Sequence, residues 1–485
     1  MEEILSKSKN FTVEYCCTVV RVGQLEAVEN SDNLAKTIVN GEQIVVNKNE
    51  IHEGDIMLYI SNECQIANWF LSANNLYQHW ELNANAPIVE QFLKQDPNFL
   101  QSDEMKALRG YFGDNGRVRM IRLRSCPSFG VLMKTSSLLK ADESLEGFDW
   151  EAALGQDFDT VNGNLFVQAY VPPRKNRTQH GMHGVSRWDR FCRLVNGQFK
   201  LHYDTAPLKR YLDLFNMDTS IAVTVKVHGT SFICGNLLVN TPLRFFKLRR
   251  MLNRFFKLGI NETKQEYGMI VSSRKVIKNE WANAEHKEGY YGQDIWTEYG
   301  NIIYPYIPKG ITVYGEICGY LTNDTKMIQK DYDYGCRVGD NFLMPYRITE
   351  HRADGIYDYD IDEVIEFTHR MTDKMKACSD PNFTRIFNIE KVLVFEGLVR
   401  DLPSIDTDNI ESLTTALAMQ GSLEANEPLC KKKVPREGVV VRINKDQVSE
   451  AFKLKALKFM EREAKLVDGG EVDIEMANNT EEQQT

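Results

Sequence analysis

The sequence predicts an α+β protein in which a small N-terminal β-barrel precedes a larger domain of strands and helices. Its 485 residues exceed what one hydrophobic core usually organises, so at least two domains are expected. Short β-rich runs separated by turn residues fill the first 60 residues, whereas longer strand and helix patterns follow residue 200. No long uncharged apolar run of the transmembrane kind is present.

Composition narrows the function classes. The formal net charge is -10, so any surface that binds nucleic acid must be a local basic patch. The N-terminus is acidic and no apolar stretch follows it, which argues against a secretory signal. The ten cysteines show no close CxxC pairing, which favours reduced thiols over disulfides or a zinc site. We therefore expect a cytoplasmic or nuclear protein that is not secreted.

The barrel is predicted from three β-rich runs over residues 11–21, 44–46 and 56–60. A further strand is expected over residues 117–124, where basic and apolar residues alternate but change phase at Met120-Ile121. A bulge at that point would bring four arginines onto one face, where they would contact nucleic-acid phosphates. A solvated edge strand explains the same pattern. The four arginines are Arg117, Arg119, Arg122 and Arg124.

An interdomain connector is expected in the middle of the chain. Residues 140–160 are acidic and weakly periodic, and residues 174–193 are rich in Arg, Gly, His and Asn. His180 and His183 have no nearby Cys or acidic partners there, so exposed histidines are expected rather than a metal site. The predicted organisation is a small β-barrel domain over residues 1–155, a linker with a mobile loop over 156–199, a second domain over 200–475 and a disordered tail over 476–485.

The second domain is predicted to combine β-branched strands with an amphipathic helix. Strands are expected over residues 221–227 and 437–443. Residues 452–456 alternate strictly, so Lys453 and Lys455 share one face while three apolar residues share the other. A helix is expected over residues 243–258, with a basic face that suits a membrane, a nucleic acid or solvent. Its apolar stripe consists of Phe245, Leu248, Leu252 and Phe255.

The chemistry is carried by five short segments in a fixed order. Each arises readily by chance when it occurs alone, so the inference depends on their combination. The sequence contains neither a GxxxxGK phosphate loop nor a GxGxxG fingerprint, so any nucleotide chemistry uses another kind of site. The five segments are Lys226-Val227-His228-Gly229, Ser272-Ser273-Arg274, Tyr314-Gly315-Glu316, Glu437-Gly438-Val439-Val440-Val441 and Lys453-Leu454-Lys455.

These residue types fit covalent attack by Lys226 on a nucleotide. A lysine attacks an α-phosphate only as a neutral amine, although the pKa of a free lysine is about 10.4. Two nearby lysines, Lys453 and Lys455, together with a bound magnesium ion would favour the neutral amine and neutralise a triphosphate. Gly229 allows the chain to pass close to the nucleotide.

Three further residues complete the expected nucleotide site. Arg274 would hold ribose or phosphate with its planar guanidinium. Glu316 and Glu437 would accept a ribose hydroxyl and bind magnesium or its water ligands. Taken singly, each carboxylate is equally explained as the surface end of a strand.

The ordered segments resemble the nucleotidyltransferase motifs shared by ATP-dependent DNA ligases, RNA ligases and mRNA capping enzymes. The KVHGTS form of the first motif is similar to the RNA ligase branch, because DNA ligases typically carry Asp at the position of His228. Three further strings resemble the ATP-dependent RNA ligases that have an N-terminal OB module. These strings are His202-Tyr203-Asp204-Thr205, residues 272–279 and Tyr346-Arg347-Ile348-Thr349.

This resemblance implies an OB-like β-barrel followed by an adenylyltransferase (ATP-grasp-like ligase) domain of antiparallel sheets with flanking helices. It covers nearly the whole chain, although residues 350–430 and 174–193 have no clear counterpart. The resemblance implies that Lys226 is the adenylated nucleophile and that Tyr346 stacks on adenine. It also implies that Glu316 binds the ribose and that Glu437 binds the catalytic metal. The ATP-binding residues it implies are His228, Gly229, Arg274, Glu316, Tyr346, Glu437, Lys453 and Lys455.

The expected activity is that of an ATP-dependent RNA ligase, which joins 3′-hydroxyl and 5′-phosphate ends through a lysyl-AMP intermediate. The family suggests nicks with RNA on the 3′-hydroxyl side, ATP with Mg²⁺ or Mn²⁺ as cofactors, and a monomer that binds RNA or an RNA-containing nicked duplex and no membrane. One alternative is a GTP-dependent mRNA capping-type transferase, disfavoured because little chain follows Lys455. The other is a catalytically silent RNA-binding protein.

Overall fold

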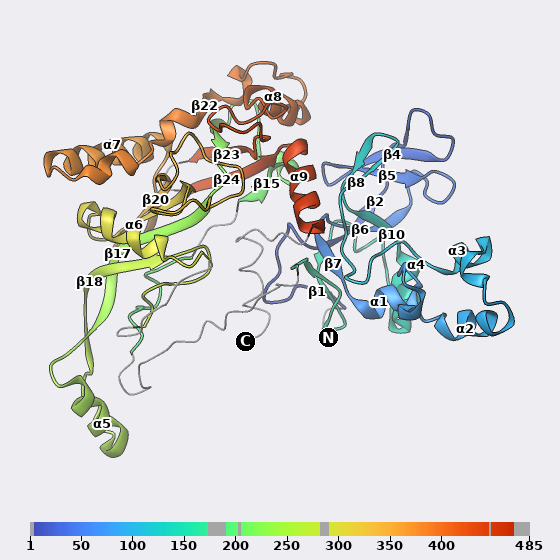
Figure 1. Cartoon of the computed structure of the whole chain (residues 1–485), viewed down its shortest axis with the longest axis horizontal. Coiled ribbons are helices and arrows are strands. Elements are labelled where there is room, and N and C mark those ends of the chain that lie inside the picture. Colours follow the sequence, from blue (N-terminus) through green and yellow to red (C-terminus); the bar gives the residue numbers. More distant parts are fainter. Residues whose placement is uncertain (1–3, 173–190, 202–204, 282–290, 446–447, 470–485) are drawn as a thin grey trace. The chain divides into compact units, whose positions relative to one another are not determined.

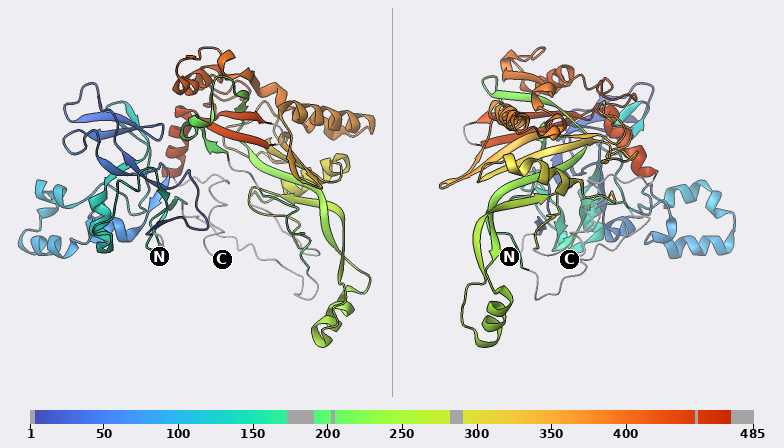
Figure 2. Two further views of the ribbon diagram at one scale, coloured as in Figure 1. Left: turned by 180° about the vertical axis from the view of Figure 1, so that it is seen from behind. Right: turned by 60° about the vertical axis from the view of Figure 1, so that its left-hand side comes forward.

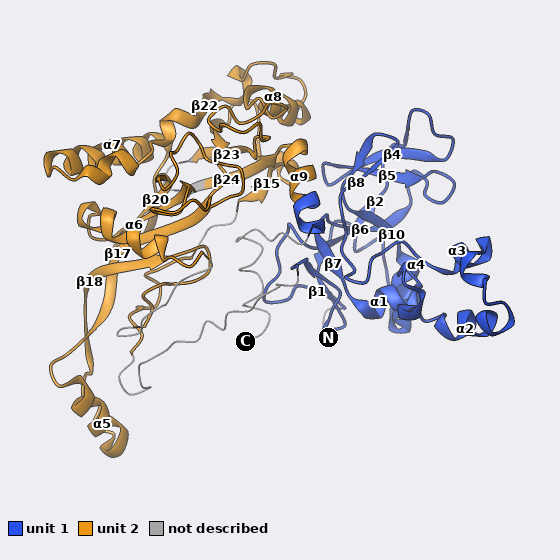
Figure 3. Ribbon diagram, viewed as in Figure 1, with its two compact units in different colours: residues 1–172, 464–469 blue, residues 173–463, 470–485 orange. Residues whose placement is uncertain are grey.

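The computed structural model describes residues 4–172, 191–201, 205–281, 291–445 and 448–469. The chain forms two compact units (Figure 3): residues 1–172 together with 464–469, and residues 173–463 together with 470–485. Both units combine largely antiparallel sheets with helices, as the α+β prediction requires, and one sheet of the second unit includes a parallel strand pair. No helix in the described ranges is long and apolar enough to cross a membrane.

Over residues 4–172 the first unit is mainly β-structure and contains four α-helices (Figure 1). Its helices are α1 (Asn68–Ala73), α2 (Ala86–Gln95), α3 (Asp103–Leu108) and α4 (Thr135–Ala141). Its strands are β1 (Leu5–Ser6), β2 (Cys17–Arg21), β3 (Glu26–Ala27), β4 (Leu34–Val39), β5 (Glu42–Asn47), β6 (Ile56–Ile60), β7 (Cys64–Ile66), β8 (Ile121–Leu123), β9 (Cys126–Ser128), β10 (Val131–Lys134), β11 (Asp157–Phe158), β12 (Thr160–Val161), β13 (Asn164–Leu165) and β14 (Val167–Ala169).

The strands of the first unit agree with the sequence prediction only in part. The expected strands over residues 44–46 and 56–60 are confirmed as β5 and β6. The run over residues 11–21 is a strand only from Cys17, because backbone bonds from Phe11 to Ser8 and from Tyr15 to Thr12 form turns before it. The largest sheet of this unit has the order β10-β6-β2-β11 and is open, and no closed barrel forms among the described residues.

The first unit also extends further along the chain than expected. Residues 157–169 were expected in a linker, but they form strands β11 to β14. Phe158 pairs with Cys17 in β2, and Val167 pairs with Ile66 in β7, so these strands are joined to the N-terminal sheets. The linker prediction therefore fails for residues 156–172, whereas residues 173–190, including His180 and His183, lie outside the described residues.

Within the described residues, the second unit contains two five-stranded sheets and further helices (Figure 2). The sheet orders are β15-β24-β23-β16-β22 and β18-β17-β19-β20-β21. The strands are β15 (Ala206–Pro207), β16 (Ser220–Lys226), β17 (Thr230–Pro242), β18 (Thr263–Ser272), β19 (Ile311–Gly319), β20 (Asn341–Arg352), β21 (Gly355–Asp358), β22 (Leu393–Leu398), β23 (Gly438–Lys445) and β24 (Val448–Lys455). The helices are α5 (Phe246–Phe256), α6 (Ile295–Ile303), α7 (Ile361–Ala377), α8 (Leu413–Gln420) and α9 (Leu457–Asp468), whose last turn belongs to the first unit.

One hydrophobic cluster contains residues of both sheets of the second unit. Val223 and Val439 come from the first sheet, and Phe232 and Val313 from the second, and all four are fully buried. The β-branched runs that predicted strands over residues 221–227 and 437–443 are thus core strands, as expected for residues that pack well on a pleated surface. This core fixes the strand ends at which the candidate site residues lie.

The long segment over residues 350–430 adds α7, β22 and α8 to this core. Helix α7 begins with a capping box: the Asp360 carboxylate accepts from the Glu363 backbone amide, and the Glu363 carboxylate accepts from the Asp360 amide. Val364 and Met371 of this helix are buried in the cluster. Strand β22 pairs with β16, so this segment supports the strand that carries Lys226.

Candidate active site

Lys226 and Glu437 form an ion pair at the centre of the candidate site. Lys226 is the last residue of β16, and its Nζ donates to Oε1 of Glu437 at 2.6 Å. The Glu437 side chain is buried, with 4% exposed, whereas that of Lys226 is 22% exposed. Burial raises the pKa of the Glu437 carboxyl, but the charges of Lys226 and His228 outweigh burial and hold this pKa well below its ordinary value. Glu437 is therefore a carboxylate at neutral pH.

Gly229 passes within hydrogen-bond reach of Glu316. The Gly229 amide donates to Oε1 of Glu316 at 3.1 Å, and Glu316 is itself buried on β19. A Cβ at Gly229 would lie 2.3 Å from the carbonyl oxygen of Ile317 and 2.7 Å from Sγ of Cys318, so no larger residue fits without movement. The glycine of the KxxG segment thus permits close packing of two backbones and positions the Glu316 carboxylate beside the lysine segment.

His228 is held by aromatic residues. Its ring stands edge-on to Tyr332 and Phe459, with centroids 4.9 and 5.0 Å away. Its backbone amide donates to the Tyr334 hydroxyl at 2.6 Å, and its Nδ1 lies 3.5 Å from Oε2 of Glu437. Because the aromatic rings restrict the imidazole, His228 orients Glu437 through the carboxylate oxygen that Lys226 does not contact.

Three lysines share one face of the first sheet. The register pairs Lys226 with Gly438 and Gly438 with Lys455, and paired residues project to the same face. Gly438 has no side chain, so nothing separates the two lysines along this row. Lys453 lies two residues before Lys455 and therefore projects to the same side. The alternation predicted for residues 452–456 is confirmed, because Phe452, Leu454 and Ala456 are buried.

Lys455 is positioned by contacts from α9. Its Nζ lies 3.1 Å from Oε2 of Glu463 and 5.7 Å from the ring centroid of Phe459. The charge of Lys455 also lowers the pKa of Glu437, less strongly than Lys226 and His228 do. A cation so placed would lie beside the phosphates of a nucleotide bound at Lys226.

Arg274 and Tyr346 occupy irregular positions next to the second sheet. Arg274 follows β18 in a turn closed by the bond from the Ser273 amide to the Val276 carbonyl oxygen, and it is partly exposed. Tyr346 lies where the β19–β20 register shifts: Tyr314 pairs with Arg347 and Gly315 with Pro345, which leaves Tyr346 outside the ladder. Such bulges redirect a side chain, and Tyr346 packs against the edge of the core.

The carboxylates suit a divalent cation that keeps water or phosphate ligands. Oε2 of Glu437 is buried and makes no hydrogen bond of ordinary length among the described residues; Nδ1 of His228 lies 3.5 Å from it. No group of three metal-ligating side chains occurs in the described part of the chain. Mg²⁺ is commonly bound by one or two carboxylates together with substrate phosphates, so Glu437 and Glu316 fit such a cation.

The four arginines predicted to contact nucleic acid do not all lie on one exposed surface. Arg117 is buried: its guanidinium donates to both carboxylate oxygens of Glu63 at 2.7 and 2.8 Å and to Asp468 at 2.8 Å. The expected strand over residues 117–124 is wrong except at β8, because Arg124 and Ser125 have φ of 48° and 70° and turn the chain into β9. Of the four arginines, Arg119, Arg122 and Arg124 are exposed.

Several residues that contact the site were missed by the sequence analysis. Gln329 donates to the Gly229 carbonyl oxygen at 2.7 Å, and Tyr332 and Tyr334 contact His228. They lie in an irregular loop, where no hydrophobic period exists to detect; the only signal is the run Asp331-Tyr332-Asp333-Tyr334. Arg442 was also missed. It projects to the lysine face, and burial, followed by the charge of Arg347, lowers its pKa to about 10.

Solved structures with the same fold are found among RNA ligases. An apo mutant of an RNA ligase of Naegleria gruberi matches with a TM-score of 0.51 and 16% identity, covering 92% of this chain and 98% of the ligase. A mutant of that ligase with ATP and Mn matches at 0.51 and 14%, covering 93% and 99%. A mutant with AMP and Mn matches at 0.50 and 15%, covering 92% and 98%.

These matches define the fold: the chain has the fold of a nucleotide-binding ligase over almost its entire length. In particular, it has the fold of the Naegleria RNA ligase. At 14–16% identity the likeness concerns the fold alone. No protein-family model matches the sequence, and no curated protein matches it.

Proposed function

We propose that the protein is an ATP-dependent RNA ligase that works through a lysyl-AMP intermediate. The observation that carries this proposal is that Lys226 shares one sheet face with Lys455 and forms an ion pair with Glu437, with Gly229 and Glu316 beside them. The fold shared with an RNA ligase whose structures contain ATP or AMP and Mn supports the choice of nucleotide. The KVHGTS form of the first motif and the other segments that resemble RNA ligases support the choice of RNA.

The first step is adenylylation of Lys226. The amine must be neutral to attack, so the ion pair with Glu437 has to open and Nζ has to lose a proton. Nζ then forms a bond to the α-phosphorus of ATP, and the bond from that phosphorus to the bridging oxygen of the β-phosphate breaks. Pyrophosphate leaves, and AMP remains attached to the lysine. Lys453 and Lys455 would neutralise the departing phosphates.

The next two steps transfer AMP and then join the ends. An oxygen of the RNA 5′-phosphate attacks the phosphorus of lysyl-AMP. The bond from that phosphorus to Nζ breaks, and Nζ takes up a proton from solvent, so that Lys226 leaves as the amine. A 3′-hydroxyl then attacks the activated 5′-phosphorus, loses its proton and displaces AMP, which forms the phosphodiester. Arg274 would contact AMP and the 5′-phosphate, Tyr346 would stack on adenine, and Glu316 would accept a hydrogen bond from ribose.

A divalent cation, Mg²⁺ or Mn²⁺, would be held by Glu437 with Glu316 and would stabilise negative charge on the phosphates. This assignment is supported by the buried Oε2 of Glu437, which makes no hydrogen bond of ordinary length among the described residues and has Nδ1 of His228 at 3.5 Å. His228 would keep the Glu437 carboxylate in place from its other side.

We further propose that the first unit holds nucleic acid near the break, in the manner of an OB-like module. The exposed arginines Arg119, Arg122 and Arg124 would contact phosphates, and Arg117 has no such role because it is buried in ion pairs. The substrate would be a nicked duplex with RNA on the 3′-hydroxyl side. The protein would act as a monomer in RNA repair, in the cytoplasm or nucleus.

Nucleotide labelling followed by sealing assays tests this function. The wild-type protein is incubated with radiolabelled ATP or GTP and Mg²⁺ or Mn²⁺, and then with nicked duplexes that carry RNA or DNA on each side of the break. We expect acid-labile labelling from ATP and sealing when the 3′-hydroxyl strand ends in RNA. Labelling from GTP alone would indicate a capping-type transferase, and no labelling under any metal condition would indicate a silent RNA-binding protein.

A further inference from the structure

A two-stranded arm of the second unit ends in a helix whose apolar residues face outward. Strand β17 pairs with β19 as far as Gly235, whereas from Asn236 to Pro242 its ladder continues with β18, and an isolated bridge joins Val239 to Leu194 on the other edge. Seven residues at about 3.3 Å each extend the arm by about 20 Å. Helix α5 lies at the far end of these two strands in both views (Figures 1 and 2).

The polar residues of α5 hold the helix to the end of the arm. The Asn253 side chain donates to the Ile260 carbonyl oxygen at 2.6 Å and accepts from the Ile260 amide at 2.7 Å. Arg250 Nε donates to the Glu262 carboxylate at 3.1 Å, and Arg249 Nη1 donates to the Asn261 carbonyl oxygen at 3.2 Å. The tip is therefore a folded structure whose side chains have defined positions.

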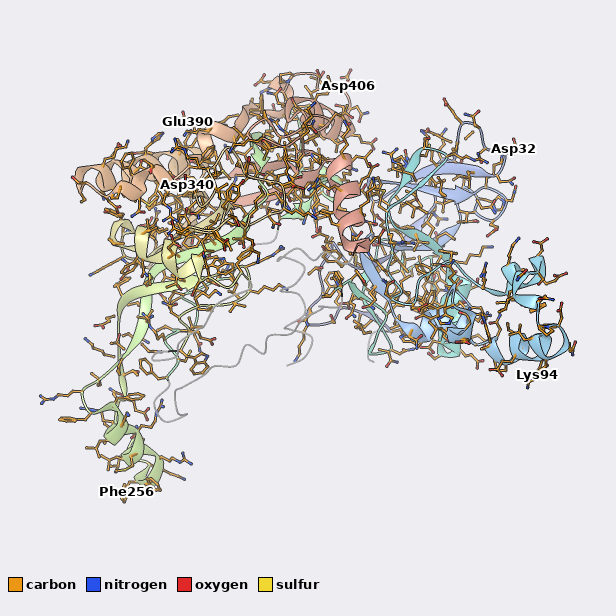
Figure 4. The ribbon with its side chains drawn as sticks, in the orientation of Figure 1. Asp32, Lys94, Phe256, Asp340, Glu390 and Asp406 are labelled. Carbon is orange, nitrogen blue, oxygen red and sulfur yellow. The ribbon has the colours of Figure 1, made fainter. Side chains whose placement is uncertain are left out.

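The aromatic residues at the tip are directed away from these anchors. Phe245, Phe255 and Phe256 are 64%, 68% and 65% exposed, and Phe256 is labelled at the end of the arm in Figure 4. Phe246, by contrast, is covered by Phe191 at 5.2 Å and by Arg250 at 4.4 Å. An amphipathic helix ordinarily buries its apolar stripe, so exposed rings at this density indicate a binding surface.

The charge at the tip identifies the kind of partner. Between Leu243 and Asn261 the chain has six basic residues and no acidic one, although its net charge is -10. A polyanion complements this segment. Exposed rings beside guanidinium groups, as with Arg244 at 4.9 Å from the Phe245 centroid, also match the stacking of unpaired bases between cations. The six residues are Arg244, Lys247, Arg249, Arg250, Arg254 and Lys257.

We propose that the α5 tip is a binding site for single-stranded RNA, in which Phe255 and Phe256 stack on bases while Arg254 and Lys257 contact phosphates. The choice of RNA rests on the proposed ligase function. It is supported by the attachment of the arm: β17 begins at Thr230, four residues after Lys226, and its Ser231 pairs with Glu316 of β19, so the arm continues a strand that borders the candidate nucleotide site. The arm would then grip RNA at a distance from the reacting ends.

Two variants of the full-length chain test this inference. Phe255→Ala/Phe256→Ala removes two exposed rings, and Arg254→Gln/Lys257→Gln removes two exposed cations. A matched control, Val338→Ala/Met419→Ala, removes two apolar side chains that are 61% and 62% exposed elsewhere in the unit. Binding of a fluorescent, 5′-phosphorylated single-stranded RNA is followed by anisotropy over a range of salt concentrations. Binding to anionic vesicles and sedimentation velocity test the two other possible partners, a membrane and a second copy of the chain.

We expect the double alanine variant to bind RNA at least about tenfold more weakly than wild type, and the control to bind as wild type. The glutamine variant should lower the slope of log affinity against log salt by about 0.7 for each phosphate that it no longer neutralises. Wild-type RNA affinity in both variants would overturn the proposal. So would loss of vesicle binding or of self-association with RNA binding intact, because the tip would then bind a membrane or a second copy.

Labelling of the same preparations with ATP separates this inference from the proposed function. The α5 variants should form the lysyl-AMP adduct at the wild-type rate, because α5 is not part of the nucleotide site. If wild type forms no adduct but the alanine variant loses RNA affinity, the ligase proposal fails and the RNA site stands. If adduct formation is normal and RNA affinity is unchanged, the ligase proposal stands and the RNA site fails.

Discussion

Glu437 reaches two basic residues of the same short segment: its Oε1 lies 2.6 Å from Nζ of Lys226, and its Oε2 lies 3.5 Å from Nδ1 of His228. Lys226 and Glu437 are thus a pre-formed pair across adjacent strands. The pair keeps the lysine in place before ATP binds, and it must open for the amine to attack. The same carboxylate is also the proposed ligand for the divalent cation.

Replacing Glu437 by glutamine should remove both roles of the carboxylate while keeping the fold. Glu437→Gln keeps the shape and removes the charge, so we expect adduct formation with ATP to fall by about 100-fold. The rate of labelling in a single turnover measures this. Glu427→Gln is the matched control, because Glu427 is also buried and lies 3.5 Å from Arg436 rather than beside the lysine. Equal labelling by wild type and Glu437→Gln would exclude a role for the charge.

Acid should weaken the protein through the same carboxyl. The folded-state pKa of Glu437 lies below its ordinary value of 4.5, so its contribution to stability is complete above pH 4.5 and is lost as pH falls below it. The free energy of unfolding should therefore fall less steeply with acid in Glu437→Gln than in wild type. Urea unfolding at several pH values below neutrality measures this. Parallel pH profiles for the two proteins would contradict the pairing.

Gly229→Ala should damage the site through packing. The added Cβ meets the Ile317 carbonyl oxygen at 2.3 Å, so the backbone has to shift and the bond between the Gly229 amide and Glu316 weakens. We expect a loss of roughly 1–3 kcal/mol in stability together with slower adduct formation. Gly23→Ala is the control, since a Cβ there meets nothing within 4 Å. Thermal unfolding and ATP labelling are the readouts, and wild-type behaviour of Gly229→Ala would refute the packing argument.

The four arginines of the first unit should separate into two classes. Arg117→Gln leaves Glu63 partly buried without its cation and should cost about 3 kcal/mol in stability. Neutralising Arg119, Arg122 and Arg124 should leave stability and adduct formation unchanged but weaken sealing of nicked duplexes at physiological salt. Unfolding curves and sealing rates distinguish the classes. Unchanged sealing by the triple variant would remove the proposed phosphate surface.

The core strands of the second unit were predictable because local pattern and burial agree there. Strict alternation at Phe452, Leu454 and Ala456 identified the buried face, and the β-branched run ending at Lys226 identified a core strand. The order of the motifs also singled out residues that the fold brings together, since Lys226 contacts Glu437 and shares a sheet face with Lys455. Chemical requirements thus leave a signal even where the residues are far apart in sequence.

Other features depend on long-range pairing, which local sequence does not encode. The row Lys226–Gly438–Lys455 follows from strand register, and the pairing of Lys226 with Glu437 follows from a neighbouring strand. Arg117 lies in the same alternating run as Arg119. It is nevertheless buried, because Glu63 and Asp468 form ion pairs with it. The open sheets of the first unit likewise depend on which strands pair, so short β-rich runs overpredicted a barrel.

Covalent labelling with radiolabelled ATP tests most directly whether Lys226 is the adenylated residue. Lys226→Ala is resolved on denaturing gels beside wild type. Lys209→Ala, which changes a lysine on another segment of the same unit, is the control. We expect an acid-labile AMP adduct on wild type and on Lys209→Ala, and none on Lys226→Ala. Circular dichroism checks that this variant is folded at the labelling temperature, because the unpaired charge of Glu437 should lower its unfolding temperature. An AMP adduct on folded Lys226→Ala would contradict the assignment of Lys226 as the adenylated residue.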